Sequence, residues 1–199
     1  AIWAASFAMG HLWGPYIRLC ILTGQRSRSD VLQMQWGWID FSRNRYEIPN
    51  PKNGRPHIVH LSDPAIGELQ RLKKQQANQT SAFVFTTTGK RAASGVSKAK
   101  LRLDHFIQQY WTELGHKSPF QPWVLHDLRR SQATALAEAG FDEGVVDRIQ
   151  NHVASGSRVS AVAAVYNKAQ KLTERAAALD TWALMVTGRP TNIVQLREA

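Results

Sequence analysis

The chain has 199 residues, enough for one large domain or two small ones with a substantial hydrophobic core. Its 43% hydrophobic and 20% charged residues are typical of a folded protein and exclude a collagen-like, disordered or disulfide-built chain. Lysine and arginine number 25 against 15 acidic residues, which gives a formal net charge of +10. This balance favours a polyanionic partner, because each neutralised phosphate releases counterions. Charge alone does not choose between DNA, RNA and an anionic membrane.

The single cysteine, Cys20, excludes an intramolecular disulfide and sits among aliphatic residues. This setting predicts a small buried hydrophobic side chain in a reducing compartment. No apolar run approaches the roughly 20 residues that a membrane span needs. The first residues lack the basic segment of a signal peptide, and residue 1 is not methionine. We therefore expect a fragment of a longer protein with no membrane partner.

The first third of the chain changes from a helical to a strand pattern. Apolar blocks in residues 15–23, ended by Gly24, predict a helix with a glycine stop. A second short helix is expected next, with Ser27 as its candidate cap. Three short strands follow, at residues 36–41, 45–48 and 57–61. Asn53-Gly54 between the last two is a strong tight-turn signal, so a small antiparallel sheet is predicted.

The rest of the chain has helical periodicity interrupted by breaker-rich connections. Helices are expected at residues 62–78, 97–114, 125–139, 142–150 and 160–186. A Thr-, Ser- and Gly-rich loop at residues 86–95 carries Lys90 and Arg91. The predicted fold class is one mainly α domain with a small three-stranded antiparallel β-sheet.

Several common chemistries have no motif in this sequence. It contains no P-loop, no GxGxxG and no Cys/His spacing of a zinc site, and no three acidic residues stand out as a magnesium site. The sequence therefore predicts no metal and no cofactor. Any phosphoryl chemistry would have to use basic residues in place of a metal ion.

The candidate chemical residues are basic or polar side chains at helix ends and turns. They are Arg26, Lys52, His126, Arg129, His152 and Tyr166. His126 and Arg129 are three residues apart at a helix start, so they project from one face. Each residue also has an ordinary structural interpretation. These are a surface or capping arginine at 26, a solvated lysine at 52, an ion-pair network of His126 and Arg129 with Asp127, a helix cap at His152 and a half-buried aromatic at Tyr166.

The order of these residues resembles the tyrosine recombinases of the phage integrase type. Residues 21–36, ILTGQRSRSDVLQMQW, resemble the first arginine box of that family, and residues 124–140, VLHDLRRSQATALAEAG, resemble the second closely. RIQNH at 148–152, with AVYNK at 164–168, resembles the third. The resemblance covers residues 11–186, and six matches in the correct order make it specific.

Some features depart from the common pattern of the family. The gap from His152 to Tyr166 is longer than in many members and resembles prophage and genomic-island integrases. Asp30 stands where glutamate is commoner, and the DNA-clamping domain that precedes the catalytic domain in family members is missing. We therefore expect residues 1–186 to be a catalytic domain and residues 187–199 to be a C-terminal tail.

The resemblance implies strand cleavage and rejoining through a covalent 3′-phosphotyrosyl link, without ATP or metal. Tyr166 would be the nucleophile. Arg26 and Arg129 would hold the non-bridging phosphate oxygens with planar, multidentate donors, and His152 would add a further donor. Lys52 would protonate the departing 5′ oxygen, and His126 would act as proton acceptor for the tyrosine.

The resemblance also implies partners. They are double-stranded DNA attachment sites, other protomers in a tetrameric synapse and DNA-bending accessory factors, in the nucleoid of a bacterial cytoplasm. Lys90, Arg91, Lys98 and Arg130 are the candidate DNA-backbone contacts. Three other interpretations stay open: a type IB topoisomerase with the same catalytic residues, a DNA-binding protein that keeps the fold without the chemistry, and a basic helical domain that binds nucleic acid as a scaffold.

Overall fold

The computed structural model describes residues 1–54, 56–77, 80–152 and 171–188. Its helices are α1 (Ile2–Ala5), α2 (Gly10–Thr23), α3 (Asp63–Gln75), α4 (Val96–Glu113), α5 (Leu125–Glu138), α6 (Glu143–Ile149) and α8 (Leu172–Thr187). Short turns of other helix types are η1 (Ser6–Met9), η2 (Ser27–Val31) and η3 (Trp36–Trp38). The strands are β1 (Ile39–Asp40), β2 (Arg45–Ile48) and β3 (His57–His60). None of the helices in these ranges combines the length and apolar character that crossing a membrane requires.

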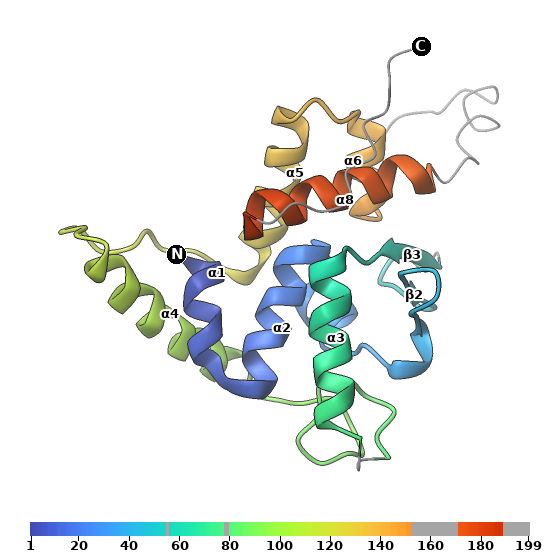
Figure 1. The fold of residues 1–199 in the computed structure, drawn as a ribbon, viewed down its shortest axis with the longest axis horizontal. Helices are drawn as coiled ribbons and strands as arrows, with labels where there is room; N and C mark the ends of the chain where they lie inside the picture. The colour runs from blue at the N-terminus through green and yellow to red at the C-terminus, as the bar shows by residue number, and fades with distance from the viewer. Residues whose placement is uncertain (55, 78–79, 153–170, 189–199) are drawn as a thin grey trace.

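The elements form two layers that meet at the C-terminal end of α2 (Figure 1). One layer holds α2 and α3, with α1 and α4 on one side and the sheet on the other. The other layer holds α5, α6 and α8, and both α5 and α8 contact α2. The C-terminal end of α2 therefore lies where residues from both halves of the chain can meet.

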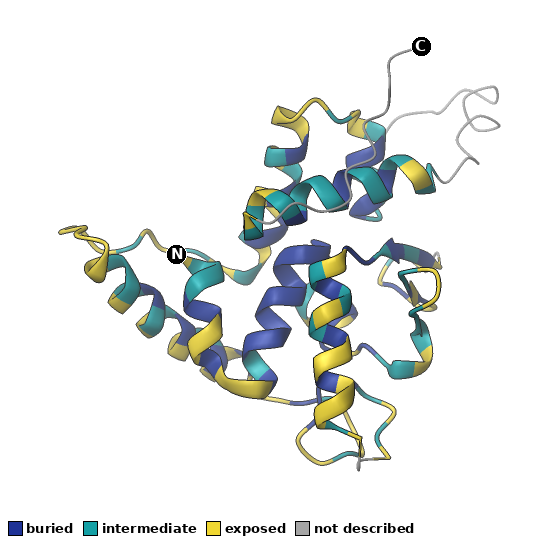
Figure 2. Cartoon of the chain, in the orientation of Figure 1, coloured by how far each residue is buried: buried dark blue, intermediate teal, exposed yellow. Residues whose placement is uncertain are grey.

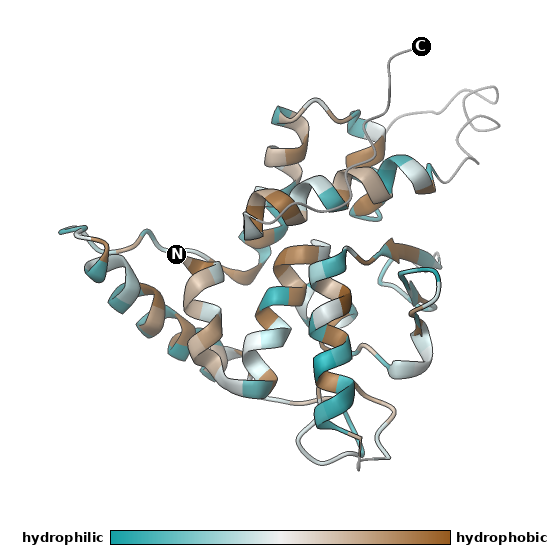
Figure 3. Ribbon diagram, in the orientation of Figure 1, coloured by the Kyte–Doolittle hydropathy of each residue, from teal (hydrophilic) through white to brown (hydrophobic). Residues whose placement is uncertain are grey.

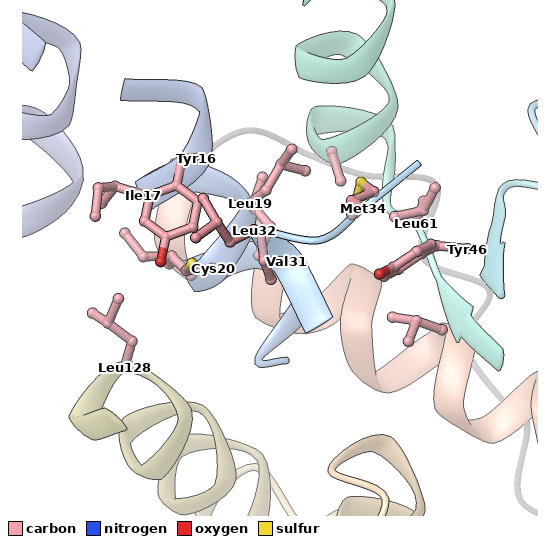
Figure 4. Close-up of a cluster of buried hydrophobic side chains, with 14 of the residues drawn as sticks. Tyr16, Ile17, Leu19, Cys20, Val31, Leu32, Met34, Tyr46, Leu61 and Leu128 are labelled. Carbon is pink, nitrogen blue, oxygen red and sulfur yellow. The ribbon is translucent and has the colours of Figure 1, made fainter. Parts of the chain in front are cut away.

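The core is built around α2, whose residues from Gly14 to Thr23 are all buried (Figure 2). A helix that is apolar on every side is expected to be covered on every side. The C-terminal half of α2 is hydrophobic, whereas the lower half of α3 carries hydrophilic residues (Figure 3). In the close-up of the core, Leu128 of α5 points toward Cys20 and Tyr16 of α2 (Figure 4). This contact seats the start of α5 on α2.

The expected three-stranded antiparallel sheet is confirmed, with strand order β1-β2-β3. Tyr46 pairs with Val59, and Ile48 pairs with His57. The first strand, however, is shorter than the sequence predicted, because Trp36–Trp38 forms a 3-10 turn. The Trp36 backbone N–H donates to the Ala82 carbonyl at 2.9 Å, so the start of this segment is hydrogen-bonded to the loop after α3 and not to β2.

Two helix boundaries also differ from expectation. The first long helix begins at Gly10, five residues before the predicted start, and contains Pro15 in its interior. The predicted single helix over 160–186 is wrong at Lys171, whose φ of 44° and ψ of 46° lie in the left-handed region. A right-handed helix cannot continue through such a residue, so α8 begins at Leu172, ends at Thr187 and is capped by Gly188.

Candidate active site

The site begins where α2 ends, at Gly24. This residue has a φ of 62°, and its N–H donates to the Cys20 carbonyl at 3.2 Å. A Cβ atom at Gly24 would lie 1.8 Å from Oε1 of Gln132, a fully buried side chain of α5. Glycine is therefore required here for both the left-handed conformation and the close approach of α5. The result is that the chain leaving α2 passes directly beneath α5.

Arg129 is the buried centre of the site, with 3% of its surface exposed. Its Nη1 donates to the Gly24 carbonyl at 2.9 Å, and its Nη2 donates to the Gln150 carbonyl. The Gln150 side chain donates back to the Arg129 carbonyl at 2.7 Å. Arg129 thus joins α5 to the ends of α2 and α6. Among the described residues it forms no salt bridge with a carboxylate: its hydrogen bonds go to carbonyl groups, and the charge of Asp30 favours the charged guanidinium without direct contact.

Arg26 lies beside Arg129 at the start of a π-turn. Burial first, and then the charge of Arg26, lower the pKa of Arg129 to about 10. Arg26 Nη1 lies 3.5 Å from Asp30 Oδ2, and its backbone N–H donates to the same oxygen at 3.2 Å. The expected cap at Ser27 is therefore wrong, because the Asp30 carboxylate closes this turn. Two guanidinium groups thus share one buried carboxylate, which leaves the site positively charged.

His126 faces the same cationic group from the first turn of α5. Its pKa is lowered by partial burial and then by the charges of Arg130 and Arg129. A neutral imidazole, which can accept a proton, is therefore favoured. The ion-pair network suggested for His126 and Arg129 is not formed. Asp127 pairs with Arg130 at 3.1 Å and accepts the Val124 backbone N–H at 2.8 Å, so it caps α5.

Lys52 lies on the turn between β2 and β3, as the Asn-Gly signal predicted. The Gly54 N–H donates to the Pro51 carbonyl at 2.8 Å. Asn53 Nδ2 donates to the Asn151 carbonyl at 2.9 Å, and Asn151 Nδ2 donates to Asn53 Oδ1 at 3.2 Å. This reciprocal pair holds the turn that carries Lys52 against the end of α6. Lys52 itself is exposed, and it precedes Asn53, whose partner Asn151 precedes His152 in the sequence.

His152 follows α6 at the edge of the site and is exposed. Its backbone N–H donates to the Asp147 carbonyl at 2.9 Å, and its Nδ1 lies 3.1 Å from Asp147 Oδ1. The structure thus brings Arg26, His126 and Arg129 together and places Lys52 and His152 beside Asn151. The His152 ring contacts Asp147 rather than the two arginines. Tyr166 lies outside the described residues.

Sequence analysis missed His57, which is 5% exposed at the start of β3. Its Nε2 lies 3.0 Å from the Ile149 carbonyl at the end of α6. Burial first, and then the charge of Arg175, lower its pKa to about 4. The ring is therefore neutral near pH 7, and Nε2 must donate because a carbonyl can only accept. The two-residue period of a strand, which puts His57 on the same face as Val59, was the signal that could have placed it inward.

The four candidate DNA-backbone contacts, Lys90, Arg91, Lys98 and Arg130, are all exposed. Nη2 of Arg28 lies 3.3 Å from Ser97 Oγ, so the turn after Arg26 lies beside the start of α4, which carries Lys98. A further cavity of about 280 Å³ is lined by basic residues of the sheet and α8, among them Arg43, Arg45 and Arg175. In the described ranges, no three His, Cys, Asp or Glu side chains are grouped to hold a metal ion.

A sequence model of the phage integrase family matches residues 8–173. The chain belongs to the phage integrase family. It is similar to the prophage integrase IntA of Escherichia coli (strain K12), with 26% identity over 170 residues. The similar segment covers 84% of this chain but 37% of that relative, so this integrase chain spans little more than a third of the relative's length. The family expected from the sequence is confirmed.

Solved structures of recombinases are similar to this integrase chain in fold. XerA recombinase has a TM-score of 0.57 at 15% identity, over 84% of this chain and 59% of that chain. XerH site-specific recombinase bound to difH substrate has a TM-score of 0.58 at 17% identity, over 77% of this chain and 45% of that chain. The lambda integrase catalytic core has a TM-score of 0.50 at 18% identity, over 79% and 88%. At these identities the likeness establishes the fold, and it confirms the expected tyrosine-recombinase catalytic-domain fold.

Proposed function

We propose that this chain is the catalytic domain of a site-specific DNA recombinase, which cleaves and rejoins DNA through a 3′-phosphotyrosyl intermediate to integrate or excise a mobile element. The observation that carries the proposal is the Arg26–Arg129 pair. Two like charges are brought together, one of them buried, and burial and mutual repulsion lower the pKa of Arg129 to about 10. Such a pair is stabilised by an anion, and a DNA phosphodiester supplies one.

The phosphate would lie against both guanidinium groups. Arg129 uses Nη1 and Nη2 for the carbonyls of Gly24 and Gln150, which orients the plane of its guanidinium before DNA arrives. Charge that develops on the non-bridging oxygens in the transition state then meets donors that need no reorganisation. Fork-shaped guanidinium groups suit this task better than ammonium groups, because they present several parallel donors.

Proton transfer is assigned to residues around this phosphate. Tyr166 would attack phosphorus and break the bond to the 5′ oxygen, so its phenolic proton must leave and the 5′ oxygen must gain one. His126, whose pKa is lowered by partial burial and then by its cationic neighbours, would accept the tyrosine proton. Lys52 would protonate the 5′ oxygen, and His152 would donate to the phosphate from the end of α6. No step consumes ATP, because the phosphotyrosyl bond conserves the bond energy.

The proposed partners are DNA attachment sites and further protomers. Related structures include the Tn1549 transposon integrase in complex with circular intermediate DNA and a lambda integrase dimer bound to a core site. We extend both features to the full-length protein, with a tetrameric synapse and DNA-bending accessory factors acting in the bacterial nucleoid. The division into a catalytic domain at 1–186 and a tail at 187–199 belongs to the same proposal.

The decisive experiment is a covalent-trapping assay on a nicked half-site of the element's own attachment sequence. We expect wild-type protein to form a covalent protein–DNA adduct that EDTA does not prevent. Tyr166→Phe should abolish the adduct while DNA affinity stays within about twofold, because only one oxygen is removed. Tyr110→Phe serves as the matched control and should react normally. Adduct formed by Tyr166→Phe would refute the assignment, and relaxation of any supercoiled plasmid without a site would favour the topoisomerase interpretation.

DNA binding by this chain should be weak and strongly dependent on salt. Each phosphate contact made by a lysine or arginine releases a counterion, so affinity falls steeply as salt rises. We expect Arg130→Ala to reduce the slope of log affinity against log salt by about one. Fluorescence anisotropy between about 50 and 200 mM salt measures this slope. Affinity that does not change over this range would exclude an electrostatic interface.

A further inference from the structure

We propose that His57 is a positioning residue, which sets His152 relative to Arg129 by holding the C-terminal end of α6. This inference rests on the proposed function, because it assigns His57 a part in the same site. His57 lies inside the protein and acts through backbone carbonyls rather than on DNA. It is separate from the six residues that the sequence indicated.

The C-terminal end of α6 is held by side chains from outside the helix. A helix leaves its last carbonyls without partners inside the helix, so other groups must satisfy them. Here three consecutive carbonyls at the end of α6 accept side-chain donors from other parts of the chain. We call these donors the α6 clamp: His57 and Gln25 on Ile149, Arg129 on Gln150, and Asn53 on Asn151.

The α6 clamp connects four parts of the chain to the end of α6. Gln25 brings in the end of α2, with its Nε2 2.8 Å from the Ile149 carbonyl. Arg129 brings in α5, and Asn53 brings in the turn that carries Lys52. His57 brings in β3 itself, since it pairs with Ile48 as the last pair of the β2–β3 ladder, next to the turn. The clamp therefore places the sheet, the Lys52 turn and the phosphate-binding arginines around one helix end.

The His57 ring is kept neutral by burial and by the positive charges that surround it. Arg175 of α8, Arg129 of α5 and Arg26 all face it and oppose a positive charge on the ring. The ring is consequently a neutral Nε2–H donor, held rigidly at 5% exposure. A donor on a rigid strand defines the position of Ile149 more closely than a donor on a flexible loop. The backbone then reaches His152 within three residues.

The consequence is a specific kinetic prediction. If the end of α6 shifts, His152 moves away from its position beside the phosphate, while Arg26 and Arg129 still bind DNA. Misplacement of about 1 Å can lower a rate on the order of a hundredfold without changing ground-state binding. Loss of the His57 donor should thus slow adduct formation and leave DNA affinity unchanged.

The experiment compares three variants in the covalent-trapping assay under single-turnover conditions. His57→Phe keeps a ring but removes the donor, and we expect at least a tenfold slower rate with DNA affinity within twofold. His57→Gln places an amide N–H near the position of Nε2 and should recover to within about threefold of wild type. Val59→Ala, a buried position on the same strand outside the clamp, controls for loss of stability and should react within threefold of wild type.

Amide hydrogen exchange in the free protein provides a second measurement that does not require catalysis. The His152 N–H, which donates to Asp147, should exchange at least tenfold faster in His57→Phe and normally in His57→Gln and Val59→Ala. A wild-type rate in His57→Phe, or equal losses in His57→Phe and Val59→Ala, would overturn the inference. If wild type forms no adduct, the proposed function fails, and unchanged exchange in His57→Phe would then reject the clamp on its own.

Discussion

The side chains of Arg129 and Gln150 each donate to the backbone carbonyl of the other residue and so link α5 to the end of α6. The arginine donates to the Gln150 backbone carbonyl, and the glutamine side chain donates to the Arg129 backbone carbonyl at 2.7 Å. Both residues are buried, so neither bond competes with bulk water. The residue assigned to the phosphate is therefore also a structural link between two helices, and its substitution should affect both activity and stability.

Arg129→Ala should lower the rate of adduct formation by about 10²–10³, because the transition-state charge loses preorganised donors. It should also lower the free energy of unfolding by about 1–3 kcal/mol, because the carbonyls of Gly24 and Gln150 lose their donor. Arg130→Ala is the matched control, because the Arg130 side chain, next to Arg129 in the sequence, is exposed and pairs with Asp127. Trapping assays and urea denaturation measure the two effects. Equal cleavage rates for both variants would reject the role of Arg129.

Lys52→Ala should slow cleavage of ordinary DNA, because the departing 5′ oxygen would leave without its proton donor. A substrate with sulfur at the 5′-bridging position should restore much of the rate, since a thiolate leaves without a proton. Arg129→Ala should not be rescued by this substrate, because its defect lies in the non-bridging oxygens. Rates on both substrates for both variants test this. A Lys52→Ala defect that persists on the sulfur substrate would argue against general-acid catalysis by Lys52.

Gly24→Ala should destabilise the protein more than Gly188→Ala. Both glycines end a helix with nearly the same left-handed dihedrals, φ 62° at Gly24 and 64° at Gly188. Alanine in this conformation costs about 1–2 kcal/mol at either position. Only at Gly24 would the new Cβ meet Gln132, 1.8 Å away, and overpacking adds about 1–3 kcal/mol. Denaturant midpoints measure the difference, and equal losses would show that α5 can retreat from this position.

Stability should fall on acidification because of His57. Its folded pKa of about 4 lies below the ordinary value of 6.5, so between these values the unfolded chain binds a proton that the native chain does not. The contribution is complete above pH 6.5 and is lost as pH falls toward 4, by about 1.4 kcal/mol per pH unit and about 3 kcal/mol in total.

The matched comparison for this pH effect is His57→Gln, which keeps a donor but cannot titrate. Urea unfolding of both proteins between about pH 7.5 and 4.5 should give curves that diverge on the acid side, with wild type losing more. Other titrating groups contribute equally to both curves and cancel in the difference. Parallel curves would mean that folding does not lower the pKa of His57.

Local features of the chain could be predicted from the sequence alone. Hydrophobic periodicity predicted the positions of α3, α4, α5 and α6, and Asn53-Gly54 predicted the tight turn between β2 and β3. The resemblance to tyrosine recombinases indicated Arg26, His126 and Arg129 as members of one site. These signals depend on neighbours within a few residues or on a motif, so they can be read without tertiary structure.

Long-range contacts decided the rest. His57 lies 92 residues before Ile149, Arg129 lies 105 residues after Gly24, and Gln25 lies 124 residues before Ile149. No local pattern shows that a strand histidine satisfies a helix carbonyl, or that Arg129 takes the carbonyls of Gly24 and Gln150 as partners. Buried donors and acceptors must be paired wherever the folded chain brings them, so the partners of the site residues are set by packing and not by spacing.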